Sequence, residues 1–75
     1  MAGIYEMIIH GHLDARWAQR FEGMALTQLD DGTTRLQGFI IDQAALHAHL
    51  TCIRDLGLEL ISVQRLATDE TTDNA

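Results

Sequence analysis

The sequence predicts an α+β domain of ferredoxin-like β-α-β-β-α-β organisation, with an antiparallel sheet, helices on one face and a short first helix. Three observations predict it: a β-branched run near the start of the chain, a central hairpin, and a capped helix followed by another β-branched run. This order contains two β-α-β units, which place their helices together on one side of the sheet.

The first strand is predicted at residues 4–10 and the first helix at residues 15–20. The strand is rich in β-branched and aromatic residues, and Gly11 interrupts it. Asp14 is suited to accept hydrogen bonds as the N-cap of the helix. One face of this helix collects three apolar side chains spaced four residues apart: Leu13, Trp17 and Phe21.

A hairpin follows, with strands at residues 23–29 and 33–41. The Asp-Asp-Gly sequence at 30–32 favours a turn, because aspartate bonds to nearby backbone groups and glycine accepts a positive φ.

The main helix is predicted at residues 43–56 and the last strand at residues 58–66. Asp42 can cap the start of this helix, and Gly57 can end it. The centre of its apolar face consists of Leu46, Leu50 and Ile53.

His49 and Cys52 lie on one flank of that apolar face. We expect His49 at the edge of the core or at a dimer interface. The chemical alternative is a nucleophile–base pair, since the two residues are three apart on one side of the helix.

Residues 1–66 are predicted to form a single domain, because the whole chain of 75 residues is too short for two. Residues 67–75 are rich in threonine and aspartate and contain little that a core would bury. We therefore predict a disordered acidic tail there.

The charge and hydropathy of the chain argue against two classes of partner. The net charge is −6, and the five basic residues are all arginine. A nucleic-acid interface needs clustered basic residues, and no apolar run reaches the length of a membrane-spanning helix. We expect no nucleic-acid or membrane binding and a cytoplasmic location.

The chain is small, and its sequence contains no internal cross-link that would stabilise it. Cys52 is the only cysteine, so no internal disulfide can form, and no Cys/His zinc pattern is present. The predicted strands carry apolar residues on both faces, which requires cover on both sides of the sheet. We therefore expect a homodimer packed through the sheet face that the helices leave open.

Five residues in the first part of the chain are the candidate contacts for a ligand or partner: His10, His12, Arg16, Trp17 and Arg20. Trp17 is suited to anchor the core or an interface. The alternative is a wall on which a ligand stacks while one of the two arginines pairs with an anion.

His10 and His12, with Asp14, also form a candidate metal site. Imidazole and carboxylate are good ligands for zinc-like metals, and alternate residues converge if the strand continues through Gly11. Because Asp14 is better explained as a helix cap, we assign no metal and no other cofactor.

Glu6 is unusual in a strand predicted to be buried. A buried glutamate can act as a general acid or base, and Tyr5, His10 and His12 are its candidate companions if they converge in a pocket. No assembled catalytic signature is visible, so no catalytic residue is assigned.

Several short segments resemble a pattern in small stand-alone bacterial proteins of unknown function, and this resemblance covers residues 4–66. It implies a compact unit and no particular activity. The order of elements and the Leu-Gly-Leu-x-Leu-Ile-Ser-Val ending at 56–63 are also similar to ACT-type regulatory domains, which often bind small effectors at dimer interfaces. The segments that carry the first resemblance include Gly11-His12-Leu13-Asp14, Asp31-Gly32-Thr33-Thr34 and Ile53-Arg54-Asp55-Leu56-Gly57-Leu58.

These observations predict a small homodimeric accessory or regulatory protein that acts through protein–protein or small-ligand contacts. Its expected partners are a second copy of the chain and a protein or a small anionic ligand. The alternatives are a small dimeric ferredoxin-like enzyme that uses acid/base residues in a pocket, and a metal-binding protein that uses His10 and His12.

Overall fold

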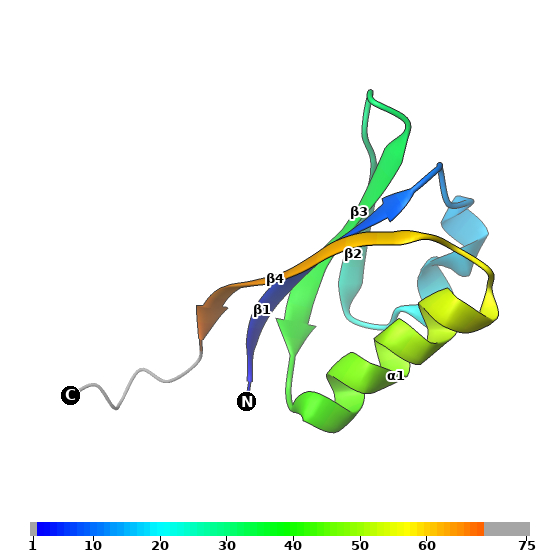
Figure 1. The fold of residues 1–75 in the computed structure, drawn as a ribbon. Coiled ribbons are helices and arrows are strands. Elements are labelled where there is room, and N and C mark those ends of the chain that lie inside the picture. The colour runs from blue at the N-terminus through cyan, green and yellow to red at the C-terminus, as the bar shows by residue number, and fades with distance from the viewer. Residues whose placement is uncertain (1, 69–75) are drawn as a thin grey trace.

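The structure is a computed structural model that describes residues 2–68. A four-stranded sheet lies on one side of an α-helix and a short 3₁₀ helix (Figure 1). The strands are ordered β2-β3-β1-β4, and every neighbouring pair is antiparallel. In chain order the elements are β1 (Gly3–His10), η1 (Ala15–Arg20), β2 (Met24–Gln28), β3 (Thr33–Ile40), α1 (Gln43–Asp55) and β4 (Leu60–Thr68).

The predicted α+β class and antiparallel sheet are confirmed, but the first helix is a 3₁₀ segment rather than an α-helix. Its backbone hydrogen bonds span three residues, from Trp17 N–H to Asp14 and from Phe21 N–H to Ala18. Gly23, with a φ of 83°, then turns the chain into β2. The two-helix ferredoxin-like arrangement is therefore not confirmed, because α1 is the one α-helix within residues 2–68.

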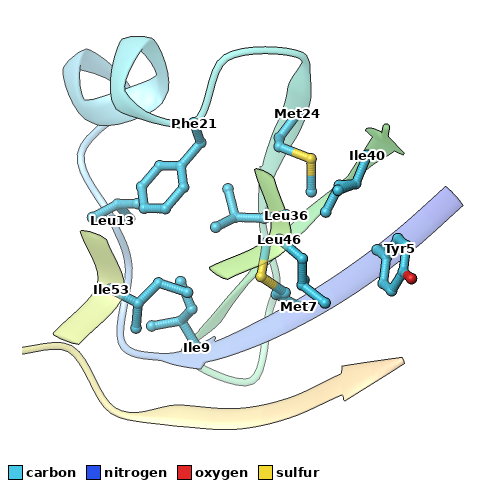
Figure 2. Packing of buried hydrophobic residues seen from close by; sticks show 10 residues of the cluster. All are labelled: Tyr5, Met7, Ile9, Leu13, Phe21, Met24, Leu36, Ile40, Leu46 and Ile53. Carbon is cyan, nitrogen blue, oxygen red and sulfur yellow. The ribbon is translucent and has the colours of Figure 1, made fainter. Parts of the chain in front are cut away.

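The core lies between the sheet and the two helices. β1 alternates as a half-buried strand should, so that Tyr5, Met7 and Ile9 point toward α1. Side chains from the other elements close around this row (Figure 2). They are Leu13, Phe21, Met24, Leu36, Ile40, Leu46 and Ile53.

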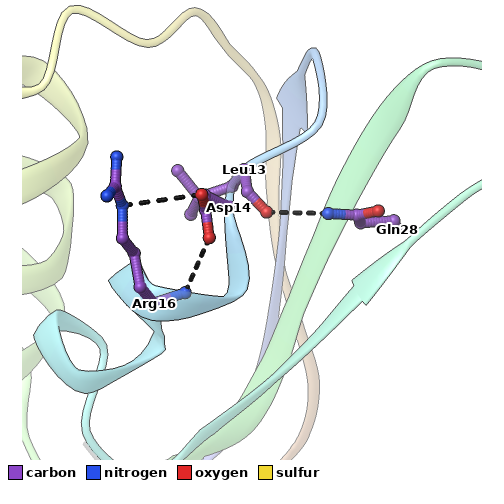
Figure 3. Close-up of polar contacts among 4 residues, drawn as sticks. All are labelled: Leu13, Asp14, Arg16 and Gln28. Carbon is purple, nitrogen blue, oxygen red and sulfur yellow. Dashed lines mark hydrogen bonds and ion pairs between the residues drawn. The ribbon is translucent and has the colours of Figure 1, made fainter.

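The loop before η1 is held against the hairpin by buried and partly buried hydrogen bonds. The hydroxyl of Thr34 on β3 donates to the Gly11 carbonyl at 2.7 Å and accepts from the Leu13 N–H at 2.9 Å. The Gln28 side-chain amide also donates to the Leu13 carbonyl at 2.9 Å (Figure 3). These bonds satisfy backbone groups that would otherwise be buried without partners, and they fix where η1 begins.

The hairpin turn forms at residues 30–32, as predicted. The Asp31 carboxylate accepts hydrogen bonds from the hydroxyl and the N–H of Thr33. These bonds hold the pKa of Asp31 below its ordinary value, since they stabilise the charged form.

α1 begins as predicted, with the Asp42 carboxylate accepting from the Ala45 N–H at 2.8 Å. Leu46 and Ile53 are buried on its inner face, whereas Leu50 is only half-buried. The helix ends at Asp55, one residue before the predicted end, with Leu56 as its C-cap.

β4 lies at the edge of the sheet and pairs with β1 alone. It begins two residues later than predicted and continues through Ala67 and Thr68, which were predicted to lie in the tail. The rest of that predicted tail lies outside the described residues. Within residues 2–68, no helix combines the length and apolarity that crossing a membrane requires.

Candidate functional site

Three of the five predicted contact residues come together on η1. The guanidinium carbon of Arg20 lies 5.2 Å from the centre of the Trp17 ring, and that of Arg16 lies 5.7 Å away. At these distances both cations are attracted to the ring face. We call Arg16, Trp17 and Arg20 the arginine–tryptophan cluster.

One of the two arginines of this cluster also pairs with an acidic residue. Arg16 pairs with Asp14, whose carboxylate also caps η1 by accepting from the Arg16 N–H at 3.0 Å (Figure 3). Arg16 and Asp14 are both well exposed, so their 3.5 Å ion pair is weak. Trp17 is half-buried and packs against the core. Trp17 therefore contacts both the core and the two guanidinium groups.

The two predicted histidines are not part of this cluster. His10 is exposed at the end of β1, on the face away from α1. The ring of His12 is tied to the hairpin instead, with Nε2 2.9 Å from the carbonyl oxygen of Leu29. Gly11 separates the two residues with a φ of 92°, so the strand does not continue through them.

The candidate metal site is not assembled. Asp14 is committed to capping η1, and His12 is bonded to the hairpin. Within residues 2–68, no three histidine, cysteine, aspartate or glutamate side chains converge as a metal site would need.

The pocket expected of an acid/base enzyme does not form from its predicted residues either. Tyr5 points into the core below α1, whereas Glu6 lies on the opposite face of β1. Glu6 lies opposite Gln37 on β3 and Gln64 on β4 across the strands. Consecutive strand residues point in opposite directions, which keeps these two side chains apart.

A surface groove of about 410 Å³ was not predicted from the sequence. It lies where the end of β3 meets α1 and the turn after η1, and its walls are largely apolar. Phe39 and Ile41 are exposed on one side of it, at 47% and 64% of their full areas. The lining residues are Glu22, Phe39, Ile40, Ile41, Ala45, Ala48 and His49. We call this feature the apolar groove.

His49 supplies one of the two polar side chains of the apolar groove. Its ring stacks on that of buried Phe21, with the centroids 5.9 Å apart and the planes inclined by 28°. Partial burial lowers the pKa of His49, so the neutral imidazole is favoured at pH 7. The expected position at the edge of the core is therefore observed, with Phe21 as its partner.

A smaller hollow of about 250 Å³ lies on the opposite flank of α1. All four of its lining residues, His47, Leu50, Thr51 and Arg54, come from that one helix. Because no second element forms a wall, this hollow is a shallow depression between side chains of one helix rather than a site.

Comparison with known proteins adds one finding. Residues 4–64 match the family described as a domain of unknown function, DUF8691. The chain belongs to the DUF8691 family. No curated protein and no solved structure matches it.

The DUF8691 match agrees with the resemblance to small proteins of unknown function and carries no activity with it. Both candidate surfaces, the arginine–tryptophan cluster and the apolar groove, lie within the matched residues. The DUF8691 unit therefore includes every element that positions them, from β1 to most of β4.

Proposed function

We propose that this DUF8691 protein is a small homodimeric accessory or regulatory protein that acts by binding. Its main ligand is an apolar segment of a partner protein that carries a basic residue, and the segment docks in the apolar groove. The observation that carries the proposal is the groove itself, in which two large apolar side chains remain exposed beside a helix.

The chemistry of the groove selects the kind of segment. Five of its seven lining residues are apolar, which favours aliphatic or aromatic side chains. Glu22 is exposed at its edge, and the lining includes no arginine. A basic residue on the segment would meet an acidic edge on a chain whose net charge is −6.

The volume of the groove limits the ligand to a few side chains. About 410 Å³ is at the lower end of the range for ligand sites, and this groove is open to solvent. We therefore expect weak binding, in the range of tens of micromolar to millimolar, as for small transient interfaces.

NMR titration with two short peptides tests the proposal. One peptide alternates leucine with lysine, and the other has glutamate in place of lysine. We expect the first to shift the resonances of Phe39, Ile41 and His49, and the second to have little effect. Equal shifts with both peptides, or shifts elsewhere only, would contradict the proposal.

A matched pair of helix variants locates the site. Ala48 lines the groove and Ala44 lies outside it, and both are exposed on α1. Ala48→Lys should abolish the shifts by filling the groove and repelling the basic peptide. Ala44→Lys adds the same charge to the same helix and should leave them unchanged.

A small anionic ligand is a second candidate, and the arginine–tryptophan cluster favours it. Two guanidinium carbons lie 5.7 and 5.2 Å from the centre of one indole ring, which brings positive charge and an aromatic surface close together. Trp17 is the only tryptophan, so its fluorescence reports on this site alone.

Titration with inorganic phosphate at constant ionic strength tests this second candidate. We expect a saturable change in Trp17 fluorescence that chloride does not reproduce. Arg20→Gln should weaken phosphate binding about tenfold, since a hydrogen bond to a charged group contributes roughly 1.5–3 kcal/mol. Arg54→Gln, an exposed arginine on α1, is the matched control and should bind as the wild type does.

A further inference from the structure

We infer that the link between Asp31 and Gly32 is a site of spontaneous covalent modification, at which aspartate isomerises to isoaspartate, and that the Thr33 side chain slows this reaction in the folded protein. The inference does not depend on the proposed binding functions. It assigns a chemical modification to the turn between β2 and β3.

Isomerisation of an aspartate begins when the backbone nitrogen of the next residue attacks the side-chain carboxyl carbon. Here a bond would form between the Gly32 nitrogen and Cγ of Asp31, the amide proton would be lost, and one carboxyl oxygen would leave as water. The product is a five-membered succinimide ring. Water then cleaves the bond between the ring nitrogen and the backbone carbonyl carbon, which leaves Gly32 attached through the side chain of residue 31. One water leaves and one is added, so the mass of the chain is unchanged and no oxidant or metal is required.

The sequence and the exposure of the turn both favour this site. Asp31 is the one aspartate in the chain that a glycine follows. Glycine has no Cβ to obstruct attack by its own nitrogen, and no atom lies within 4 Å of the position that a Cβ would take at Gly32. Asp31 and Gly32 are both exposed, so water can reach them. The other aspartates of the described residues precede bulkier residues, as Asp42 precedes Gln43.

The folded turn holds the two reacting groups away from each other. Oδ1 of Asp31 accepts hydrogen bonds from the Thr33 hydroxyl and, at 3.0 Å, from the Thr33 N–H. Both bonds direct the carboxyl group toward residue 33 rather than toward the Gly32 nitrogen. The Gly32 N–H is also engaged, since it donates to the Leu29 carbonyl at 3.3 Å. Ring closure must break these bonds, which raises its free-energy barrier.

The Thr33 bonds also keep the Asp31 carboxyl in its unreactive charge state. Ring closure consumes the protonated carboxyl, because its oxygen leaves as water far more readily than the oxygen of a carboxylate does. The bond from the Thr33 hydroxyl is the main reason why the pKa of Asp31 is below its ordinary value. A lower pKa leaves a smaller protonated fraction at pH 7, so less of the reactive form is present in the folded protein.

Isomerisation would change more than the turn itself. It lengthens the main chain between residues 31 and 32 by one carbon atom. The Gly32 carbonyl accepts from the Gly11 N–H at 2.8 Å, at the start of the loop that leads to η1. The modified turn cannot keep this contact in its present geometry, so we expect the isoaspartate form to melt at a lower temperature than the unmodified protein.

Ageing at pH 7 followed by peptide mapping tests the site. Trypsin releases residues 21–35 as one peptide, because arginine precedes and ends this stretch. The isoaspartate form of the peptide separates by chromatography at unchanged mass, and electron-transfer fragmentation distinguishes position 31 from Asp30. We expect isoaspartate to appear first at residue 31. It should accumulate at least about tenfold more slowly in the folded protein than in urea, since ring closure in the fold must first break several hydrogen bonds.

Three variants test the role of Thr33. Thr33→Val removes the hydroxyl but keeps the N–H and the shape of the side chain. It should raise the rate in the folded protein about three- to tenfold, the factor that one hydrogen bond contributes. Thr33→Ser keeps the hydroxyl and should isomerise as slowly as the wild type. Thr27→Val makes the same change at an exposed position of β2 and should leave the rate unchanged.

The possible outcomes separate the site from its protection. Isoaspartate that accumulates first at another aspartate overturns the assigned site. Equal rates for the wild type in buffer and in urea overturn protection by the turn, and this comparison requires no variant. A Thr33→Val rate equal to that of Thr27→Val, or a Thr33→Ser rate equal to that of Thr33→Val, overturns the role of the hydroxyl. In urea all four proteins should react at one rate, and a difference there would place the effect of Thr33 in the local sequence rather than in the fold.

Discussion

β1 and β4 are hydrogen-bonded neighbours of similar apolar content, yet their side chains have opposite environments. Met7 on β1 is fully buried, whereas Val63, its cross-strand partner on β4, is 39% exposed. Ile9 and its partner Leu60 repeat the contrast, at 0% and 38%. The composition of a strand therefore does not determine its burial in this sheet.

The position of α1 explains the difference. The helix lies closest to β3, and its inner side chains, Leu46 and Ile53, close the core over β1. β4 lies on the far side of β1 from β3, beyond the reach of this cover. A strand at an uncovered edge keeps its apolar side chains in water unless a partner covers them.

Truncation of the cross-strand partners Met7 and Val63 should give the largest difference in stability between β1 and β4. Met7→Ala should lower the free energy of unfolding by about 2–5 kcal/mol, because it leaves a cavity. Val63→Ala should cost less than about 1 kcal/mol, because water already reaches the side chain. Urea denaturation of both variants measures the two losses. Equal losses would show that β4 is covered in the monomer.

The next largest effect on stability is expected from substitution of Gly38, on the side of the sheet that the helices cover. A methyl group on Gly38 of β3 would collide with the Gly23 carbonyl oxygen and press on Met24. Gly38→Ala should therefore cost about 1–3 kcal/mol, as overpacking does. Its neighbour Gln37, which points to the other face, is the control, and Gln37→Ala should cost under about 0.5 kcal/mol. Thermal melting that ranks the two variants equally would contradict the close backbone approach.

Removal of the N-caps of α1 and η1, one at a time, tests which of the two helices contributes more to stability. Asp42→Ala removes the N-cap of α1 and should cost about 1 kcal/mol. Asp14→Ala removes the corresponding cap of η1 and should cost only a few tenths, since η1 is short and its end is exposed. Thermal unfolding of both variants is the measurement. A larger loss for Asp14→Ala would make η1 the more important element.

The smallest expected effect is a pH-dependent change in stability that comes from His49 and not from His47, the other histidine of α1. The pKa of His49 in the folded protein is below its unfolded value of about 6.5, so the unfolded chain takes up a proton first as pH falls. The wild type should therefore lose stability relative to His49→Gln as pH decreases below about 6.5, and not above it. Melting temperatures recorded across this range test the sign. His47→Gln, on the exposed flank, is the control variant.

Most of the fold could be predicted because its signals are local. The Asp42 cap, the 30–32 turn and the alternation of β1 each depend on a few neighbouring residues, and the structure has all three. The predicted 3.6-residue periodicity also placed Leu46 and Ile53 correctly on the buried face. The limits of η1 agree with the prediction, although its hydrogen bonding does not.

The candidate site was harder to predict because it depends on how distant segments meet. Phe39 and Ile41 read as ordinary strand residues, and only the approach of Ala48 and Glu22 makes them the wall of a groove. The uninterrupted run of three large apolar residues at 39–41, directly before a helix cap, was the one local signal. The arginine–tryptophan cluster was predictable, since its three members lie within five residues of one another on η1.

The order of the strands has a consequence for synthesis of the protein. β1 is made first but occupies an interior position, between β3 and the strand that is made last. A nascent chain that has completed α1 can already assemble β2, β3 and β1, and β1 is then the temporary edge of that sheet. Its row of β-branched residues remains open to other nascent chains until β4 emerges.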